Sequence, residues 1–407
     1  MPVNERAREE HMMLKQRSRS TTSEAVSQLS RRGLIARLAA AGLSAPAIAA
    51  VLRAPAAAQE ATPAPNEILE SLGKNPQLIQ HGTTTFETPV DLMDQFLTPN
   101  EAFFIRSNGP VSIDIDPAAW RLSVSGLVET ELELTLADLQ AMPAHTLTAF
   151  LECSGNSRSR FAADGEQAEG TQWGNGAIGN VEWTGVMLRD VLDEAGVQEG
   201  VVDVVSTGGD FPEMQRGLPL DHALDPGVML VWEMNGEALP QPNGGPVRLL
   251  VPGWGGIAST KWIAGLELID RPFDGSFNTE SYVFIDPNGA VLRPVREIPA
   301  KSVITSPVPD ASVTAGEHMI SGFAWSGYAG IDRVEVSIDG GDWQAATITE
   351  EAGPASWVRF EFPWEAAAGE HTLRSRATDQ IALQQPDEVP FNAKGYLMNA
   401  IYEVPVT

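Results

Sequence analysis

Up to residue 300, the pattern of apolar and polar residues mixes two periods. Segments 188–195 and 220–224 repeat apolar residues at intervals of three or four, which is typical of amphipathic helices. Segments 201–206 and 247–251 are short runs rich in Val and Leu, which favour buried strands. The pattern therefore predicts a mixed α+β domain in this part of the chain.

After residue 300 the pattern changes to short alternating runs, which are separated by turns rich in Gly, Asp or Pro. The runs are 318–324, 333–338, 357–362 and 371–378. Asp339-Gly340-Gly341-Asp342 follows one of them and is typical of a β-hairpin turn. Because this spacing is typical of β-sandwiches, it predicts an all-β sandwich of about 100 residues.

The first 58 residues have the pattern of an export signal. Ser30-Arg31-Arg32-Gly33-Leu34-Ile35 is a twin-arginine sequence, an alanine-rich apolar run follows over 34–52, and Ala56-Ala57-Ala58 forms a small-residue cleavage site. A membrane anchor is the alternative, but the run has only about 19 residues and contains Arg37, which makes it a poor membrane span. We therefore predict a twin-arginine signal peptide over 1–58, a periplasmic location and no stable membrane anchor. Because this route carries folded proteins, it favours a protein whose cofactor is inserted before export.

The two styles of pattern indicate two domains after the signal. About 350 residues follow it, which exceeds what one hydrophobic core usually supports. We place the domains at 59–300 and 301–407. Segment 60–76, rich in Pro and Ala, is predicted to be an extended leader.

The chain is strongly acidic, with 27 basic and 54 acidic residues and a formal net charge of −27. The first 58 residues hold nine basic and four acidic ones, so the remainder carries 18 basic and 50 acidic residues, a net charge of −32. Such a surface repels nucleic acid and anionic lipid and attracts basic partners, for example a soluble cytochrome with a basic face. A saline habitat, in which an acidic surface aids solvation, explains the same composition without any partner.

Cys153 is the only cysteine, and this count limits the chemistry of a site. A single thiol excludes an intrachain disulfide, an iron–sulfur cluster held by this chain alone and the paired thiols of a c-type haem site. Three roles stay open: a buried core residue, a nucleophile, and one thiolate ligand of a metal whose other ligands come from a cofactor. Arg158 lies five positions on, where its charge favours a thiolate.

Seven ordered motifs make the chain, from about Phe103 to its carboxyl terminus, resemble the sulfite oxidase family of molybdenum enzymes. They are Phe103-Phe104-Ile105-Arg106, Glu152-Cys153-Ser154-Gly155-Asn156, Trp183-Thr184-Gly185-Val186, Trp232-Glu233-Met234-Asn235-Gly236-Glu237, Pro246-Val247-Arg248-Leu249-Leu250-Val251-Pro252-Gly253, Lys261-Trp262 and Gly322-Phe323-Ala324-Trp325-Ser326-Gly327. By this resemblance, the first domain is expected to be the α+β molybdopterin-binding domain. The second is expected to be an immunoglobulin-like dimerisation domain, so that the protein forms a homodimer.

The resemblance implies a molybdenum–molybdopterin cofactor, whose metal is held by dithiolene sulfurs and one protein thiolate. Cys153 matches that thiolate, and a soft thiolate ligand suits such a metal. The positions that match cofactor-binding residues are Phe104, Ile105, Arg106, Ser107, Asn108, Asp210, Asn243, Arg248, Ser259, Thr260 and Lys261. Cations and the close-approaching glycine backbone of 253–256 suit the phosphate and ring edges of a pterin. An ordinary salt bridge or a solvated strand end is the alternative role for Arg248 and Lys261.

A small sulfur oxyanion needs local positive charge in so acidic a protein. By resemblance, Arg106 and Arg158 match two anion-binding arginines. Tyr282, which stands 21 residues after Lys261, has the spacing of an active-site tyrosine that donates a hydrogen bond. A half-buried strand tyrosine is its alternative role.

Three positions depart from the animal and plant enzymes. Asn108 and Asn243 stand where those enzymes have histidines, and Lys394 takes the place of a third substrate arginine. Lysine keeps the charge but lacks the planar fork that grips an oxyanion with two hydrogen bonds. The preference for sulfite therefore stays open.

The resemblance implies oxidation of sulfite to sulfate, in which Arg106, Arg158 and Lys394 fix the anion. Because the chain has no Cys-X-X-Cys-His motif, we expect a separate c-type cytochrome to accept the electrons. One alternative is a sulfane-sulfur or thiosulfate substrate, as in the molybdenum subunit of bacterial sulfur-oxidising complexes. Another is a periplasmic sulfoxide reductase, against which the β segment 302–407 counts. The third is a non-enzymatic adhesion protein with Cys153 in its core.

Overall fold

The computed structural model describes residues 65–163, 166–211, 214–285 and 289–407. The predicted signal peptide at 1–58 lies outside these residues, and so do the first positions of the predicted leader. Among the described residues, no helix has the length and apolar character needed to cross a membrane.

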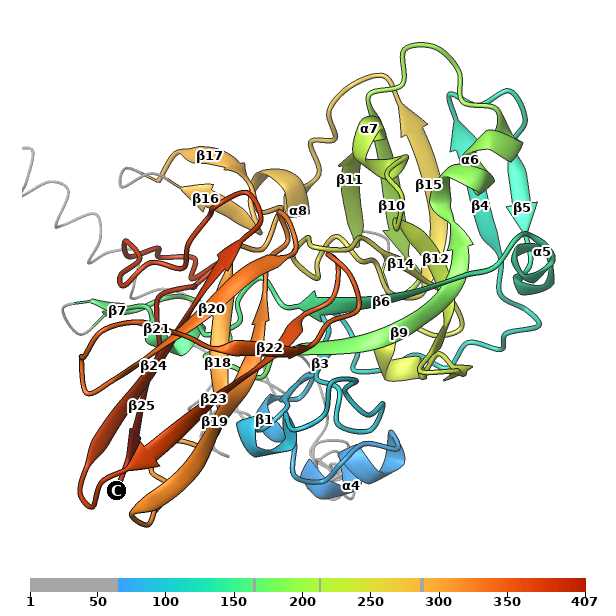
Figure 1. The fold of residues 1–407 in the computed structure, drawn as a ribbon. Coiled ribbons are helices and arrows are strands. Elements are labelled where there is room, and N and C mark those ends of the chain that lie inside the picture. Colours follow the sequence, from blue (N-terminus) through green and yellow to red (C-terminus); the bar gives the residue numbers. More distant parts are fainter. Residues whose placement is uncertain (1–64, 164–165, 212–213, 286–288) are drawn as a thin grey trace, which may run out of the picture. The chain divides into compact units, whose positions relative to one another are not determined.

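Two five-stranded sheets form most of the first part of the chain (Figure 1). The first has the order β11 (Gln215–Pro219), β10 (Asp203–Gly208), β15 (Ile263–Ile269), β4 (Leu122–Gly126) and β5 (Leu132–Leu134). The second has the order β13 (Glu237–Ala238), β12 (Met229–Met234), β9 (Ile178–Met187) and β6 (His145–Glu152), with β14 (Arg248–Leu250) paired to β12. The strand pairs within these sheets are antiparallel, except that β15 and β4 run parallel.

Short helices accompany these sheets, and α6 illustrates why they form. They are α5 (Leu136–Ala141), α6 (Leu188–Ala195) and α7 (Leu220–Ala223). α6 buries Leu188, Val191, Leu192 and Ala195, so its apolar residues share one face that packs into the core between the sheets. Gly196 ends the helix with a φ of 72°, a left-handed conformation that favours glycine. The predicted α+β class is therefore confirmed.

The segment predicted to be an extended leader, 60–76, contains a helix, so that prediction is wrong for its described part. The helix is α4 (Pro65–Ser71), beside a three-stranded sheet of β1 (Ile79–Gly82), β2 (Thr85–Glu87) and β3 (Ile105–Arg106). Ile68, Leu69 and Leu72 lie on one helical face and pack in a cluster with Ile105. The Pro- and Ala-rich composition of the segment obscures this apolar spacing.

Two four-stranded antiparallel sheets form the predicted sandwich, which is therefore confirmed (Figure 1). One has the order β18 (Lys301–Ser306), β19 (Gly316–Trp325), β23 (Val358–Ala366) and β22 (Thr347–Glu350), and the other β21 (Gln344–Ala345), β20 (Ile331–Ile338), β24 (His371–Asp379) and β25 (Glu403–Val406). The predicted turn at 339–342 joins β20 to β21. Smaller elements are β7 (Ala162–Ala163), β8 (Glu166–Gln167), α8 (Ser276–Thr279), β16 (Val283–Ile285) and β17 (Val291–Pro294). The domain boundaries stay predictions.

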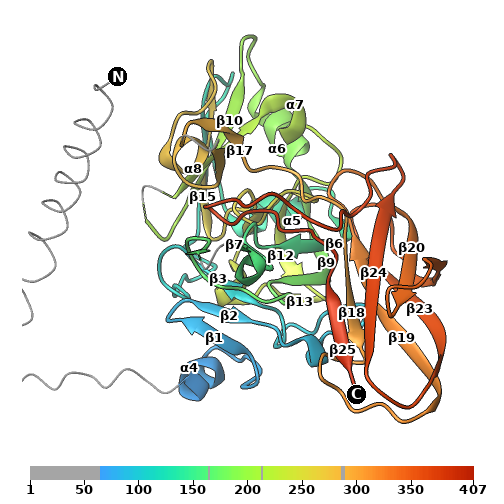
Figure 2. The same cartoon turned by 90° about the vertical axis from the view of Figure 1, so that its left-hand side faces the viewer.

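An apolar cluster joins the sandwich to the first part of the chain, where β18 lies near β6 and β9 in both views (Figures 1 and 2). Phe150 and Ile178 come from β6 and β9, whereas Phe323 and Trp325 come from β19. Beside this cluster the backbone N–H of Leu397 donates to the carbonyl of Ser154 (2.9 Å). The carboxyl-terminal segment is thereby fixed against the loop that follows β6.

Candidate functional site

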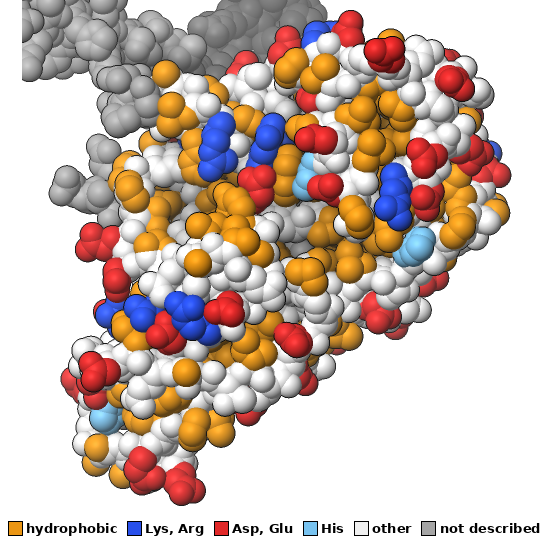
Figure 3. Space-filling model, turned by 45° about the horizontal axis from the view of Figure 1, so that its top comes forward, with side chains coloured by type: hydrophobic (Ala, Val, Ile, Leu, Met, Phe, Trp, Pro, Cys, Tyr) orange, Lys and Arg blue, Asp and Glu red, His pale blue; other side chains and the backbone are white. Residues whose placement is uncertain are grey.

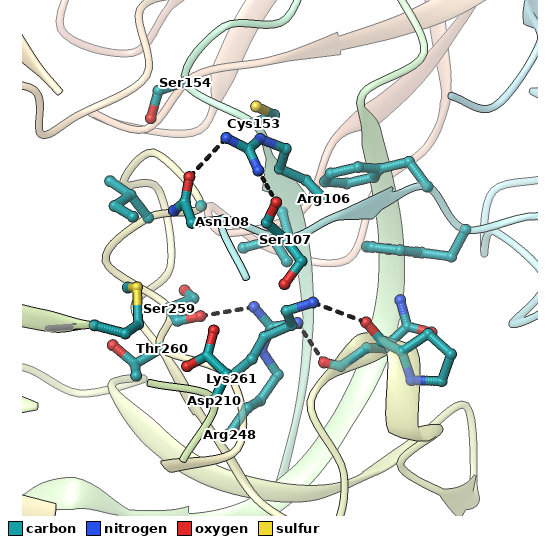
Figure 4. A pocket seen from close by; sticks show the side chains of 18 of the residues that line it. Arg106, Ser107, Asn108, Cys153, Ser154, Asp210, Arg248, Ser259, Thr260 and Lys261 are labelled. Carbon is teal, nitrogen blue, oxygen red and sulfur yellow. Dashed lines mark hydrogen bonds between the residues drawn. The ribbon is translucent and has the colours of Figure 1, made fainter. Parts of the chain in front are cut away.

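A cavity lined by both apolar and charged residues lies where β3, β6, β10 and β14 end (Figure 4). Ten of the eleven predicted cofactor-binding residues line it, together with Cys153 and Tyr282. Ile105 is the exception, since its side chain is 1% exposed and packs against Leu69. Neighbouring strand residues point to opposite faces, so Arg106 faces the cavity while Ile105 faces the cluster under α4.

The loop after β6 presents Cys153 to the cavity (Figure 4). The backbone N–H of Cys153 donates to the carbonyl of Ala177 (2.9 Å), and Asn156 Oδ1 accepts from the N–H of Ala177 (3.0 Å). Ser157 then turns the chain with a φ of 65°. These hydrogen bonds fix the direction of the thiol and aim Arg158 back toward the same region.

Two basic side chains lie across the cavity from Cys153, namely Arg248, which is buried, and Lys261, which is half-buried (Figure 4). Arg248 donates to the carbonyls of Asn243 (2.7 Å) and Ser259 (2.8 Å), and Lys261 Nζ donates to the carbonyl of Pro242 (3.1 Å). Burial lowers the pKa of Arg248 to about 9. Burial, and then the charge of Arg248, holds the pKa of Lys261 well below its usual value. Carbonyls rather than carboxylates accept these bonds, and the carboxyl of Asp210 acts on Lys261 only through its charge. The cavity wall therefore offers basic donors to an anion.

Several buried polar atoms around this cavity have no hydrogen-bond partner among the described residues. They are Ser107 Oγ, Ser154 Oγ, Asp210 Oδ1 and Arg248 Nε. Burial also raises the pKa of the Asp210 carboxyl. Buried polar atoms are normally paired, so these unpaired atoms indicate a polar ligand. A pterin with an anionic phosphate fits this combination of donors, acceptors and cations.

Glycine lets the turn after β14 approach the cysteine loop closely. The backbone N–H of Gly256 donates to the carbonyl of Glu152 (2.7 Å), and a Cβ at Gly255 would lie 2.2 Å from Ser154 Oγ. These contacts account for Gly255 and Gly256.

A second cavity of about 270 Å³ adjoins the first and shares Cys153, Arg106 and Tyr282 with it. Arg158, Lys394 and residues of the 169–171 segment complete it. Tyr282 Oη donates to Asn108 Oδ1 (3.1 Å) and lies 3.4 Å from Arg106 Nη2. The thiol and four predicted substrate residues thus share one cavity.

Arg158 is held rigidly although it has no carboxylate partner among the described residues. Its Nε donates to the carbonyl of Gly395 (3.1 Å) and its Nη1 to that of Thr171 (3.1 Å). The guanidinium lies 5.1 Å from the ring centroid of Tyr396. Lys394, by contrast, lies 3.5 Å from the exposed carboxylate of Glu169. Acidic side chains are spread over the face of the molecule shown in Figure 3. Because Arg158 contacts no carboxylate among the described residues, it provides a local positive charge within this acidic protein.

Some lining residues were missed by the sequence analysis. Ser154, Thr171 and Tyr396 line the two cavities without belonging to a predicted site. The signal for Ser154 was present in the cysteine motif, whereas Tyr396 lies in the second domain beside Lys394. In the described part of the chain, no group of three His, Cys, Asp or Glu is placed to hold a metal ion.

Two family models match the chain. Residues 108–277 match the "Oxidoreductase molybdopterin binding domain", and residues 293–407 match the "Mo-co oxidoreductase dimerisation domain". The second match supports a homodimer. Together they agree with the α+β domain and the β-sandwich described above.

Known proteins are similar to this chain over most of its length. The sulfite oxidase of Gallus gallus is 34% identical over an alignment of 341 residues, and the match covers 77% of this chain and 74% of that protein. The mitochondrial sulfite oxidase of Mus musculus is 34% identical over 351 residues, but the chain spans only 63% of its length. Among solved structures, the sulfane dehydrogenase SoxCD from Paracoccus pantotrophus is similar with a TM-score of 0.74 and 34% identity, covering 86% of this chain and 92% of that chain.

Proposed function

The chain belongs to the sulfite oxidase family of molybdenum-cofactor oxidoreductases and binds molybdenum–molybdopterin, and from this premise we propose that it oxidises sulfite to sulfate. The observation that carries the proposal is the convergence of Arg106, Arg158, Lys394 and Tyr282 on the cavity that holds Cys153. Sulfite and water give sulfate, two electrons and two protons. We further propose that a separate c-type cytochrome takes up the electrons.

The first cavity would hold the cofactor. Cys153 would ligate the metal through its sulfur, Arg248 and Lys261 would bind the phosphate, and Asp210 would accept hydrogen bonds from the pterin edge. When bound, the cofactor supplies the two-electron redox centre. Everything else in the reaction depends on how the chain holds the anion.

The arginines hold the anion by charge and direction. Since Arg158 is already fixed by two carbonyls, little side-chain entropy is lost when its remaining N–H groups bind sulfite oxygens. Arg106 approaches from β3 and binds a second oxygen. Tyr282 Oη can turn from Asn108 to donate to the same anion. These donors stabilise the charge that builds up on oxygen as sulfite becomes sulfate.

A sulfane-sulfur substrate is the second candidate. SoxCD, a sulfane dehydrogenase by its name, is similar over most of the chain, and Lys394 lacks the fork of an arginine. The cavity of about 270 Å³ also leaves room for a substrate longer than sulfite. Periplasmic location after cleavage of residues 1–58 is compatible with either substrate and is proposed from the twin-arginine sequence alone.

The decisive experiment measures metal content and turnover in the same preparation. The protein and Cys153→Ser are produced in a host that makes molybdopterin, and molybdenum per chain is determined. Cytochrome c reduction is then followed with sulfite and, separately, with thiosulfate. Molybdenum near one per chain, with sulfite-dependent reduction that Cys153→Ser abolishes, is the expected result. Turnover of thiosulfate but not sulfite would replace the first proposal by the second.

A matched pair of variants tests the substrate site. Lys394→Ala is expected to raise the KM for sulfite by about five- to tenfold, since it removes one charged hydrogen bond of about 1 kcal/mol or more. Arg333→Ala removes an equal charge from the exposed face of β20, where Arg333 lies near Asp332. An equal rise of KM in both variants would mean that general charge, not the cavity, attracts sulfite.

A further inference from the structure

Lys74 is a buried lysine in a segment that no family model matches. It follows α4, is 5% exposed, and lies before residues 108–277. Its Nζ donates to the carbonyls of Asn100 (2.6 Å) and Phe103 (3.3 Å) and to Asn243 Oδ1 (2.7 Å). Three N–H groups of the ammonium thus meet three acceptors. Burial lowers its pKa to about 7, and the charge of Glu101 acts against this shift.

The contact with Lys74 determines which way the Asn243 amide faces. Asn243 Oδ1 accepts from Lys74 Nζ, and in its ammonium form Lys74 has donors only, so the carbonyl oxygen of the amide must face it. The backbone carbonyl of Asn243 accepts from Arg248 Nη1 (2.7 Å), which fixes the residue from the other side. Asn243 lines the cofactor cavity, and its Nδ2 donates to no group among the described residues. The free N–H groups of this amide are therefore available to a ligand in the cavity.

Lys74 also adds to the positive charge around this cavity. Its charge contributes to lowering the pKa of Lys261, together with the charges of Arg248 and Arg106. Four basic side chains and the carboxyl of Asp210 thus act on the same region, and one of the basic side chains comes from the amino-terminal segment.

We propose that Lys74 is a positioning residue of the cofactor site, which holds Asn243 so that its amide donates a hydrogen bond to an acceptor atom of the molybdopterin. The amino-terminal segment thereby takes part in retaining the cofactor. The inference rests on the cofactor of the proposed function but not on its substrate. A protein that binds molybdopterin without oxidising sulfite would refute the function and leave this inference open to the test below.

The test is a double-mutant cycle read out as cofactor release. Lys74→Met, Asn243→Ala and the double variant are purified with cofactor, and the release of molybdopterin on mild warming is followed by the fluorescence of the oxidised pterin. If Lys74 acts through Asn243, each single variant releases the cofactor about tenfold faster or more, because a hydrogen bond has been lost. The double variant is then no faster than the faster single one.

A structural role predicts a different result. If Lys74 only satisfies the carbonyls of Asn100 and Phe103, the two effects multiply in the double variant. Melting of cofactor-free protein, prepared in a host without molybdopterin, measures this structural effect separately.

Replacement of the Asn243 amide by another hydrogen-bond donor provides a second test of the proposal. Histidine brings its own ring N–H to this position, so Lys74→Met with Asn243→His is expected to restore slow release. Multiplying effects, or no rescue by histidine, would overturn the proposal. If Lys74→Met does not fold, the Asn243→Ala variant alone is used. Release of molybdopterin from Asn243→Ala at the normal rate would also overturn the proposal.

Discussion

Lys301→Met should destabilise the protein strongly, because it leaves the buried carboxylate of Glu152, beside the cysteine loop, without its cation. Lys301 Nζ donates to Glu152 Oε1 (3.1 Å) and Ser157 Oγ (2.9 Å), and the two charged side chains are 3% and 4% exposed. Glu152 also accepts from Trp325 Nε1 (2.7 Å) and Asn156 Nδ2 (2.8 Å). These two neutral donors remain in the variant, but no cation does.

The expected cost follows from the loss of one partner of a buried pair. Breaking such a pair costs about 3–5 kcal/mol, whereas removing both charges together costs much less. Glu152→Gln in the same chain removes the stranded charge but leaves one of the two donors, from Trp325 or Asn156, without an acceptor, at about 1–2 kcal/mol. Lys301→Met with Glu152→Gln should therefore recover at least half of the lost stability.

Urea unfolding of cofactor-free protein, followed by circular dichroism and tryptophan fluorescence, measures both free energies. Trp325 lies in the network and reports on its loss. A loss below about 1 kcal/mol in Lys301→Met, or a double variant as unstable as the single one, would show that the charge of Glu152 is not what Lys301 compensates.

Three further predictions concern other parts of the structure. The pKa of Lys74 falls from 10.5 to about 7 on folding, so between these pH values the unfolded chain binds a proton that the folded chain lacks. The unfolding free energy of the cofactor-free protein should therefore rise by about 2 kcal/mol from pH 7.5 to pH 9.5, relative to that of Lys74→Met measured in parallel urea titrations. Tyr396→Phe keeps a ring against Arg158 but loses the hydroxyl that accepts from the Tyr282 N–H (3.2 Å), whereas Tyr396→Leu loses both, so Tyr396→Leu should raise the KM for sulfite roughly fivefold more than Tyr396→Phe does, as the loss of about 1 kcal/mol implies; equal KM values for both variants would contradict this. A Cβ at Gly176 would lie 1.7 Å from a backbone oxygen, so Gly176→Ala should lower the unfolding free energy by about 3 kcal/mol, while Gly330→Ala, which meets only a flexible side chain, should change it little.

Features of the site and the fold could be predicted from the sequence where they depend on residues close together along the chain. The loop from Cys153 to Arg158 contains the predicted metal ligand, a turn and a basic residue within six positions, and the structure brings the thiol and the arginine to one cavity. The strands of the sandwich were also predictable, since alternation of apolar and polar residues follows directly from a half-buried sheet. In both cases neighbouring residues determine the outcome.

Contacts between distant segments could not be predicted in this way. Lys74 and Asn243 are 169 positions apart, and nothing in a Pro- and Ala-rich segment indicates that its lysine is buried. Ile105 was placed in the site because it lies in a motif with Arg106, although two neighbouring strand residues face opposite sides. A motif gives the position of a residue along the chain, but the direction of its side chain follows only from the packing on both faces.

The second domain contributes directly to the active-site cavity, in addition to matching a dimerisation module. Tyr396 stacks on Tyr282 at 5.2 Å between ring centroids, and the carbonyl of Gly395 holds Arg158. Lys301 compensates the carboxylate next to Cys153. A chain that ended at residue 300 would therefore lose one wall of the substrate cavity and leave Glu152 without its cation. For this reason a shift of the sandwich at a dimer contact would reach both Arg158 and the loop that carries Cys153.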